Sequence, residues 1–393
     1  MSDTPKKIDI IYNSTLVCPW DCAVCCVDAV HVKKRGGRIE IRSDGLETFE
    51  EIQVTKDQSI YDVAAKHRQS KGLELDLDAK RRVIDHLSGY QARIDASGGD
   101  ALSVRENFTL LQYAASRLGK ANVTLTVTGA GSSAFRAAEI APHIGEYNFT
   151  FDAETLEDVA LRPEGYAAGN LKKARAFVQV GIPTRAETPL SRAILNEDHL
   201  TRLYMTLHDA GIGKLLVMRL FPVGRGTLLE HEIPQAEDYR FAIGVLKRLE
   251  EKHGWPVVKV QCALKHLVGL PSSSGGNPCD LVTESFGLMA DGTLLASPWA
   301  IGGTGRPLGP EWVLGNLARD PMTVILNSPK AQAFHGRAGE NWGHCKIFSY
   351  LNSSLPDPFD RIFDTADPVL AGSPAHPAAR EQLSLRLFQL ASG

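Results

Sequence analysis

The stretch Leu16–Val27, LVCPWDCAVCCV, places four of the chain's seven cysteines in one short segment. Cys18, Cys22 and Cys25 follow the spacing C-x3-C-x2-C, and the next cysteine after this stretch is Cys262. Soft thiolates select iron–sulfur clusters or zinc, and three of them from one loop can reach three corners of a cubane. The spacing therefore predicts a metal centre directly after the segment KIDIIYNSTL, which has the character of a first strand.

A structural zinc site is the alternative that these cysteines leave open. Tetrahedral zinc needs a fourth ligand close by, and Cys26 or His31 could supply it. Cys26 suits this role poorly, because adjacent cysteines rarely chelate one ion; a small buried thiol is its simpler interpretation. Under this alternative the chain would be a non-enzymatic interaction protein.

The composition is ordinary for a soluble globular protein. Hydrophobic residues make up 43% and charged residues 23% of 393 residues, so the chain can bury a substantial core. The net charge of −3 argues neither for nor against a nucleic-acid partner, but no block of Lys and Arg resembles a phosphate-binding patch, so we expect no nucleic-acid partner. We expect no membrane partner and no signal peptide, because no apolar run is long enough for either. The odd, clustered cysteines fit a reducing compartment, so we expect a cytoplasmic protein.

Segments of helical and strand character alternate along most of the chain. Six strand-then-helix units indicate a parallel sheet with helices outside, and active residues at the carboxyl ends of the strands. Several helices end at a glycine, as Gly119 shows, and Asn196 is the expected N-cap of one helix. The expected strands cover 7–16, 92–97, 122–131, 147–152, 183–190 and 214–224. The expected helices cover 76–90, 103–119, 132–145, 165–181, 196–211 and 236–254.

The alternation divides the chain into a large unit, a small unit and a tail. Residues 1–255 form the repeating unit, interrupted by an insertion over 31–75 with a hairpin and a helix, a candidate lid. Residues 256–350 contain short strands and loops rich in Gly, Pro and Ser. Residues 351–393 form a tail with a linker over 366–379 and a short helix over 380–390.

The cysteine loop after a first strand, together with Ser97–Asp100 (SGGD) after the second, resembles the radical S-adenosylmethionine enzymes. The resemblance implies an α/β fold, a partial (β/α)6 TIM-like barrel with a small C-terminal α+β cluster-binding domain. It also implies a [4Fe-4S] cluster on Cys18, Cys22 and Cys25, whose open iron is chelated by S-adenosyl-L-methionine. In that family, reduction of the cluster cleaves the cofactor to methionine and a 5′-deoxyadenosyl radical.

The resemblance also implies which residues contact the cofactor. Asp100 stands where the family's Gly-Gly-Glu motif has its acid, so it is expected to receive the methionine ammonium. Val24 stands where many members carry an aromatic residue that packs the adenine, so either adenine packing is weaker there or another side chain compensates. The implied cofactor-binding residues are Ser97, Gly98, Gly99, Asp100, Thr150, Asp152, Arg162, Glu187 and Ser191.

The second set of cysteines resembles the SPASM or twitch cluster domain. Cys279 and Gly292 match its C-x9–15-G-x4-C pattern, with Ser297 replacing the closing cysteine. The stretches PVGR (222–225) and LGNLARDP (314–321) also resemble that subgroup. At most one auxiliary [4Fe-4S] cluster is implied, with its fourth iron open or held by Ser297, His344 or substrate. Its implied ligands are Cys262, Cys279 and Cys345.

The alternative is a domain that kept this fold without a cluster. Scattered cysteines are individually more often small buried residues than ligands. In that case Cys345 or Cys262 could act catalytically, as a thiol that returns a hydrogen atom to the substrate radical.

The resemblance implies that the protein generates a radical, but it does not identify the substrate. Our first hypothesis is an oxidation, epimerisation or rearrangement of a small polar metabolite in biosynthesis, with an external flavodoxin- or ferredoxin-type reductant. The alternative is a maturase that crosslinks or epimerises a ribosomally made peptide; methyl and sulfur transfer are less favoured.

Overall fold

The computed structural model describes residues 6–44, 48–131, 135–152, 161–267, 279, 281–282, 284–303 and 305–370. In this part of the chain a ten-stranded sheet runs in the order β11-β10-β9-β8-β7-β6-β1-β12-β13-β14. Its strands from β11 to β12 are all parallel to their neighbours. The strands of this sheet from β1 to β11 are β1 (Lys7–Thr15), β6 (Gln91–Gly98), β7 (Val123–Thr126), β8 (Glu146–Thr150), β9 (Thr184–Leu190), β10 (Lys214–Arg219) and β11 (Val257–Val260).

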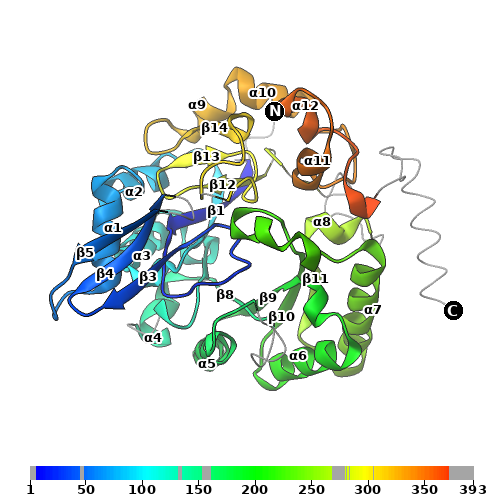
Figure 1. Ribbon diagram of the computed structural model, residues 1–393, viewed down its shortest axis with the longest axis horizontal. Helices are drawn as coiled ribbons and strands as arrows, with labels where there is room; N and C mark the ends of the chain where they lie inside the picture. The colour runs from blue at the N-terminus through cyan, green and yellow to red at the C-terminus, as the bar shows by residue number, and fades with distance from the viewer. Residues whose placement is uncertain are drawn as a thin grey trace.

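Helices connect these strands and cover the outside of the curved sheet (Figure 1). Each follows a strand and precedes the next, which confirms the predicted α/β fold with a partial barrel of parallel strands. They are α2 (Leu77–Asp85), α3 (Glu106–Leu118), α4 (Ala137–Ile140), α5 (Tyr166–Gln179), α6 (Glu197–Asp209) and α7 (Ala236–His253).

The predicted helix ends are formed by the expected residues. Asn196 caps α6, because its side chain accepts a hydrogen bond from His199 N at 2.7 Å. Gly119 ends α3 with φ of +82°. The helix expected over 132–145 is wrong in its length: among the described residues α4 has one turn, followed by a 3-10 turn at 141–143 that contains Pro142.

The C-terminal region extends the same sheet at both edges. β11 lies beside β10, whereas β12 (Ser285–Leu288) pairs in parallel with β1. β13 (Thr293–Leu295) and β14 (Val313–Asn316) follow as antiparallel strands. The remaining helices are α8 (Cys262–Lys265), α9 (Met322–Leu326), α10 (Pro329–Gly336), α11 (Lys346–Asn352) and α12 (Pro358–Ile362). The helix predicted over 380–390 lies outside the described residues.

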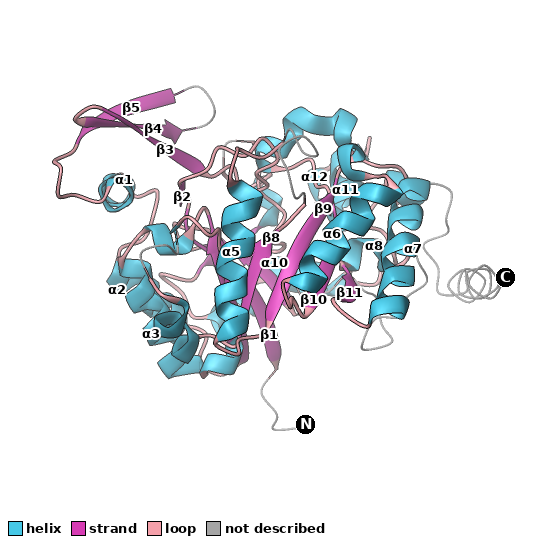
Figure 2. Ribbon diagram, turned by 90° about the horizontal axis from the view of Figure 1, so that it is seen from below, coloured by secondary structure: helices cyan, strands magenta, loops and turns pink. Residues whose placement is uncertain are grey.

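The insertion forms most of a separate four-stranded sheet that projects from the side of the barrel, to which Val17–Cys18 of the cysteine loop adds one short strand (Figure 2). Buried Glu74 joins it to the end of β1, because its carboxylate accepts hydrogen bonds from Thr15 Oγ1 at 2.8 Å and from Arg68 Nε at 2.7 Å. The predicted hairpin is β4–β5 and the predicted helix is α1. The elements are β2 (Val17–Cys18), β3 (Val30–Arg35), β4 (Arg38–Asp44), β5 (Thr48–Gln53) and α1 (Ile60–Ser70).

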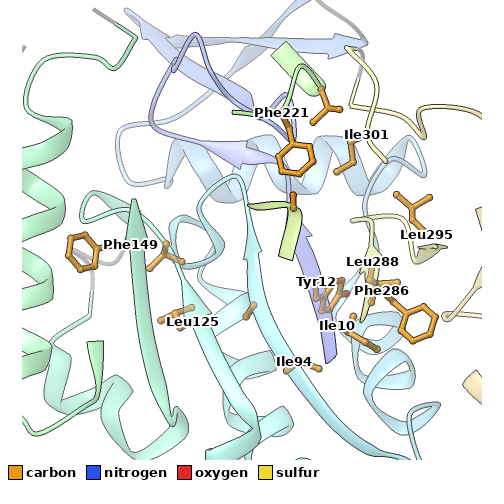
Figure 3. Packing of buried hydrophobic residues seen from close by; sticks show 14 of the residues in the cluster. Ile10, Tyr12, Ile94, Leu125, Phe149, Phe221, Phe286, Leu288, Leu295 and Ile301 are labelled. Atoms are coloured by element: carbon orange, nitrogen blue, oxygen red, sulfur yellow. The ribbon is translucent and has the colours of Figure 1, made fainter. Parts of the chain in front are cut away.

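The two faces of the parallel sheet differ in chemistry. The outer face is apolar: Ile10 and Tyr12 of β1 lie beside Phe286 and Leu288 of β12, as Figure 3 shows. Along β6 the burial alternates, so that Ile94 is in this core while its neighbours in sequence face the inside of the barrel. No helix within the described ranges is long and apolar enough to span a bilayer.

Candidate active site

A cavity of about 500 Å³ opens at the carboxyl ends of the parallel strands. Its wall includes the ends of β6, β7 and β8 and the residues that follow β10 and β11. The predicted site residues in its wall are Cys18, Cys22, Cys25, Ser97, Gly98, Gly99, Thr150, Arg162, Glu187 and Cys262. The structure therefore brings most of the residues singled out from the sequence to one place.

The three thiols of the cysteine loop lie in an environment suited to coordinated thiolates. Trp20 N donates to Cys18 Sγ at 3.5 Å, and Ala29 N donates to Cys25 Sγ at 3.2 Å. Burial raises the pKa of Cys18 and of Cys22, because removal from water disfavours the charged thiolate. A bound metal reverses this effect and deprotonates its thiol ligands. The loop thus fits an iron–sulfur group on the three cysteines.

Within the described ranges, no three Cys, His, Asp or Glu side chains are grouped closely enough to hold one metal ion. His31 lies opposite Cys18 in the β2–β3 pair, and burial lowers the pKa of its imidazole. Tetrahedral zinc coordination would require such a grouping.

Arg225 is distant from the cysteine loop in sequence but holds the loop in place through its hydrogen bonds. Its guanidinium donates to Cys22 O at 3.0 Å, to Ala29 O at 2.6 Å and to Asp28 Oδ1 at 3.2 Å. It also pairs with Asp21, and its backbone N donates to the carbonyl of Cys25 at 2.8 Å. Since both Arg225 and Asp28 are buried, this clamp fixes the path of the loop between its ligands.

Gly98, the last residue of β6, and Gly99 after it allow the chain to pass directly against the start of the cysteine loop. Gly98 has φ of +118°, and a Cβ there would lie 2.2 Å from Thr15 O. Gly99 N donates to Thr15 O at 2.8 Å. A side chain at Gly98 would therefore push the second strand away from the loop.

Asp100 lies behind the cavity wall rather than in it. It is fully buried, and its carboxylate accepts hydrogen bonds from Thr128 Oγ1 and from Gly131 N, the latter at 2.9 Å. Among the described residues, none donates a hydrogen bond to Asp100 Oδ1. The Thr128 hydroxyl also accepts a hydrogen bond from Trp20 Nε1 at 3.1 Å, so Asp100 is linked to the cysteine loop. Its role as the partner of a cofactor ammonium stays a prediction.

Because Asp100 is buried, its protonation makes the free energy of unfolding depend on pH. Desolvation raises its pKa from 3.8 to about 6, against the opposing hydrogen bonds. The folded state then binds the proton more tightly than the unfolded state, so stability falls as pH rises from about 4 to about 6, by about 3 kcal/mol in total. We expect Asp100→Asn, which keeps an acceptor for Thr128 and Gly131, to remove this component. Urea unfolding of both proteins at pH 4, 5, 6 and 7 tests this prediction. If the free energy of unfolding changed with pH in the same way in both, the prediction would be contradicted.

The remaining predicted cofactor contacts divide into two groups. Thr150, Arg162 and Glu187 reach the cavity, whereas Asp152 and Ser191 are buried outside its wall. Arg162 Nε donates to Asp152 Oδ2 at 2.8 Å, so Asp152 orients Arg162 beside the loop. Arg162 also lowers the pKa of Cys22 in opposition to the larger effect of burial.

The C-terminal cysteines lie in two places. Cys262 faces the cavity, whereas Cys345 precedes α11 and its backbone N donates to Asp367 Oδ2 at 3.0 Å. Burial raises the pKa of Cys345 to about 12, with smaller contributions from Asp367 and Cys279. Cys279 lies within electrostatic range of Cys345, and the auxiliary ligand set remains a prediction.

Sequence reasoning missed three features of the site. Arg225 and Trp20 lie in the PVGR stretch and the cysteine loop, which both stand out in the sequence. The sequence does not, however, reveal which groups these two side chains contact. Phe221 and Trp299 stack in the cavity wall with ring centroids 4.6 Å apart and an interplanar angle of 4°. Together with Trp20 and Tyr166, whose rings meet edge to face, they give the cavity wall an aromatic surface.

No family model matches this chain, and no curated protein matches it in sequence. Among solved structures it is similar to SuiB of Streptococcus suis bound to the precursor peptide SuiA, with a TM-score of 0.59 and 12% identity over 84% of this chain and 66% of that chain. It is also similar to native anSMEcpe with bound AdoMet, with a TM-score of 0.57 and 13% identity over 98% of this chain and 99% of that chain. The chain thus spans about two thirds of SuiB and nearly all of anSMEcpe. The resemblance to radical S-adenosylmethionine enzymes is confirmed at the level of the fold.

Proposed function

We propose that this protein is a radical S-adenosylmethionine enzyme that abstracts a hydrogen atom from an unactivated C–H bond of a small polar metabolite. The observation that carries the proposal is the meeting of Cys18, Cys22 and Cys25 with the Gly98–Gly99 turn in one cavity at the carboxyl ends of parallel strands. The fold it shares with AdoMet-bound anSMEcpe supports the same conclusion.

The chain's residues are suited to hold the required groups. Cys18, Cys22 and Cys25 would hold a [4Fe-4S] cluster, and the glycine turn leaves room for S-adenosylmethionine beside it. When bound and reduced by an external donor, these groups supply a 5′-deoxyadenosyl radical. Arg162 places a positive charge beside Cys22, and the Phe221–Trp299 stack covers part of the cavity wall with apolar surface.

Anaerobic reconstitution tests the proposal. We expect iron and equimolar sulfide in the protein, and 5′-deoxyadenosine after addition of dithionite and S-adenosylmethionine. Zinc without sulfide, and no 5′-deoxyadenosine, would favour the non-enzymatic zinc protein instead.

A peptide maturase is the second candidate, and the similarity to SuiB bound to its precursor peptide favours it. The genes next to this one discriminate between the two. A short precursor gene supports a peptide substrate, whereas genes for sugar aminotransferases support a small metabolite that is oxidised, epimerised or rearranged.

We propose an auxiliary [4Fe-4S] cluster on Cys262, Cys279 and Cys345, supported by the electrostatic proximity of Cys279 and Cys345. Reconstituted protein should then contain about eight irons per chain, and the double variant Cys279→Ala/Cys345→Ala about four. Iron and sulfide analysis measures both, with Cys26→Ala as the control that should keep about eight. About four irons in the unmutated protein would contradict the auxiliary cluster and direct attention to Cys345 or Cys262 as a hydrogen donor.

A further inference from the structure

The cavity wall after β11 carries two polar side chains to which the cluster and the cofactor assign no role. Gln261 and Lys265 both line the cavity, at the two ends of the short helix α8. Gln261 is the N-cap residue of α8, and Lys265 is its last residue. We call Gln261 and Lys265 the donor pair, because each offers N–H groups and they follow the same strand.

The side-chain amide of Gln261 is held in one orientation. Gln261 is 8% exposed, and its Oε1 accepts a hydrogen bond from Arg219 N at 3.0 Å. Its backbone N donates to Val217 O at 2.9 Å, so the residue is fixed against β10 from both sides. Within the described ranges Gln261 Nε2 donates to no group, although it has two N–H donors. These donors are therefore available to a ligand in the cavity.

Lys265 is a cation of the cavity wall without a counter-ion in the part of the chain that the structure describes. Each of the four arginines in the wall has a carboxylate partner instead. The pairs are Arg93–Glu146 at 3.2 Å, Arg162–Asp152 at 2.8 Å, Arg185–Glu187 at 2.8 Å and Arg219–Asp367 at 2.8 Å. The charge of Lys265 is thus the one that these pairs leave uncompensated.

The carboxylates of the wall lie away from the donor pair. Glu187 is paired with Arg185, whereas Asp9 and Asp95 belong to β1 and β6. At least four strands of the sheet separate β1 and β6 from β11. The electrostatic potential beside α8 therefore favours an anionic group.

The two members of the donor pair are close enough to bind one group. They are four residues apart across a single helical turn, which the hydrogen bond from Leu264 N to Gln261 O at 2.9 Å closes. Residues with this spacing have Cβ atoms about 5–6 Å apart. The long side chain of Lys265 can therefore direct its ammonium to a group that already accepts from Gln261 Nε2.

We infer that the donor pair binds a carboxylate of the substrate. Its two oxygens can accept from the lysine ammonium and from the glutamine amide at the same time. Phe221, two residues beyond Arg219, stacks with Trp299 in the same wall and offers apolar surface to the carbon skeleton. The inference names carboxylate-bearing metabolites as the substrate class and rests on the proposed function, although carboxylate binding itself requires neither cluster nor cofactor.

Equilibrium dialysis of the full, reconstituted chain against three matched probes tests the inference. We expect pentanoate to bind at least about tenfold more tightly at pH 7 than 1-pentanol or n-pentylamine, the difference of one charge-assisted hydrogen bond. Lys265→Met should remove most of that preference, whereas Lys265→Arg should keep it. Lys259→Met, which removes an exposed lysine of β11 outside the cavity wall, should leave the preference unchanged.

Gln261→Glu separates the donor pair from the packing of α8. This variant keeps an acceptor for Arg219 N and the volume of the side chain, but it replaces the Nε2 donors with a negative charge. We expect it to lose the preference for pentanoate as Lys265→Met does. A Gln261→Glu variant that kept the full preference would overturn the assignment of Gln261.

Other outcomes would overturn the inference as a whole. Equal affinity for the three probes would do so whether or not the variants fold. Displacement of pentanoate by S-adenosylmethionine would assign the donor pair to the cofactor, and loss of iron in Lys265→Met would assign Lys265 to the auxiliary cluster. Tighter binding of pentyl phosphate than of pentanoate would replace the carboxylate with a phosphate ester. A preference for pentanoate without 5′-deoxyadenosine formation would instead count against the proposed function and leave the carboxylate site standing.

Discussion

Replacing Cys18, Cys22 or Cys25 with alanine is expected to reduce cleavage of S-adenosylmethionine to background in each variant. Each cysteine supplies one thiolate from the same cavity wall, and a cubane needs all three to be retained. We also expect about four fewer irons per chain than in the unmutated protein. Iron analysis after anaerobic reconstitution and quantification of 5′-deoxyadenosine measure the two effects separately.

Cys26→Ala is the matched control, because Cys26 is adjacent to Cys25 and also reaches the cavity. Burial raises the pKa of its thiol to about 12, as it raises the pKa of Cys18 and Cys22, so the C-x3-C-x2-C spacing is what sets Cys26 apart from the three expected ligands. We expect this variant to keep its iron and most of its cleavage activity. An equal loss in Cys26→Ala would show that the ligands are wrongly assigned.

The parts of the fold that follow from local pattern could be predicted from the sequence. Amphipathic period, glycine at helix ends and the Asn196 cap are properties of neighbouring residues, and they place six of the parallel strands and their helices. The cysteine spacing is equally local. It identifies the carboxyl end of β1 as the site before any contact is known.

The parts that depend on distant segments could not be predicted. β12 pairs with β1 although the two are separated by most of the chain, and a strand of four residues carries no register signal of its own. Arg225 reaches Asp28 across 197 residues. The burial of Asp100 under Thr128 likewise depends on how two strands pack, so its motif indicated its position but not its surroundings.

Arg225→Met is expected to lower the free energy of unfolding by about 3–5 kcal/mol, the cost of leaving one member of a buried ion pair without its partner. Asp28 is 3% exposed, and its carboxylate would lose the guanidinium that compensates its charge. The carbonyls of Cys22 and Ala29 would lose their donors as well. Methionine fills much of the space of arginine, so the effect reports charge and hydrogen bonding more than a cavity.

The same change should loosen the loop that carries the three cysteine ligands. We expect Arg225→Met to retain less iron than the unmutated protein after gel filtration, in addition to its lower midpoint in urea. Arg117→Met removes an arginine that is half exposed and paired with Asp85 at the surface, and should cost less than about 1 kcal/mol. Adding Asp28→Asn to Arg225→Met should recover part of the lost stability, because it removes the uncompensated charge. If Arg225→Met cost no more than Arg117→Met, the clamp would not be what fixes the cysteine loop.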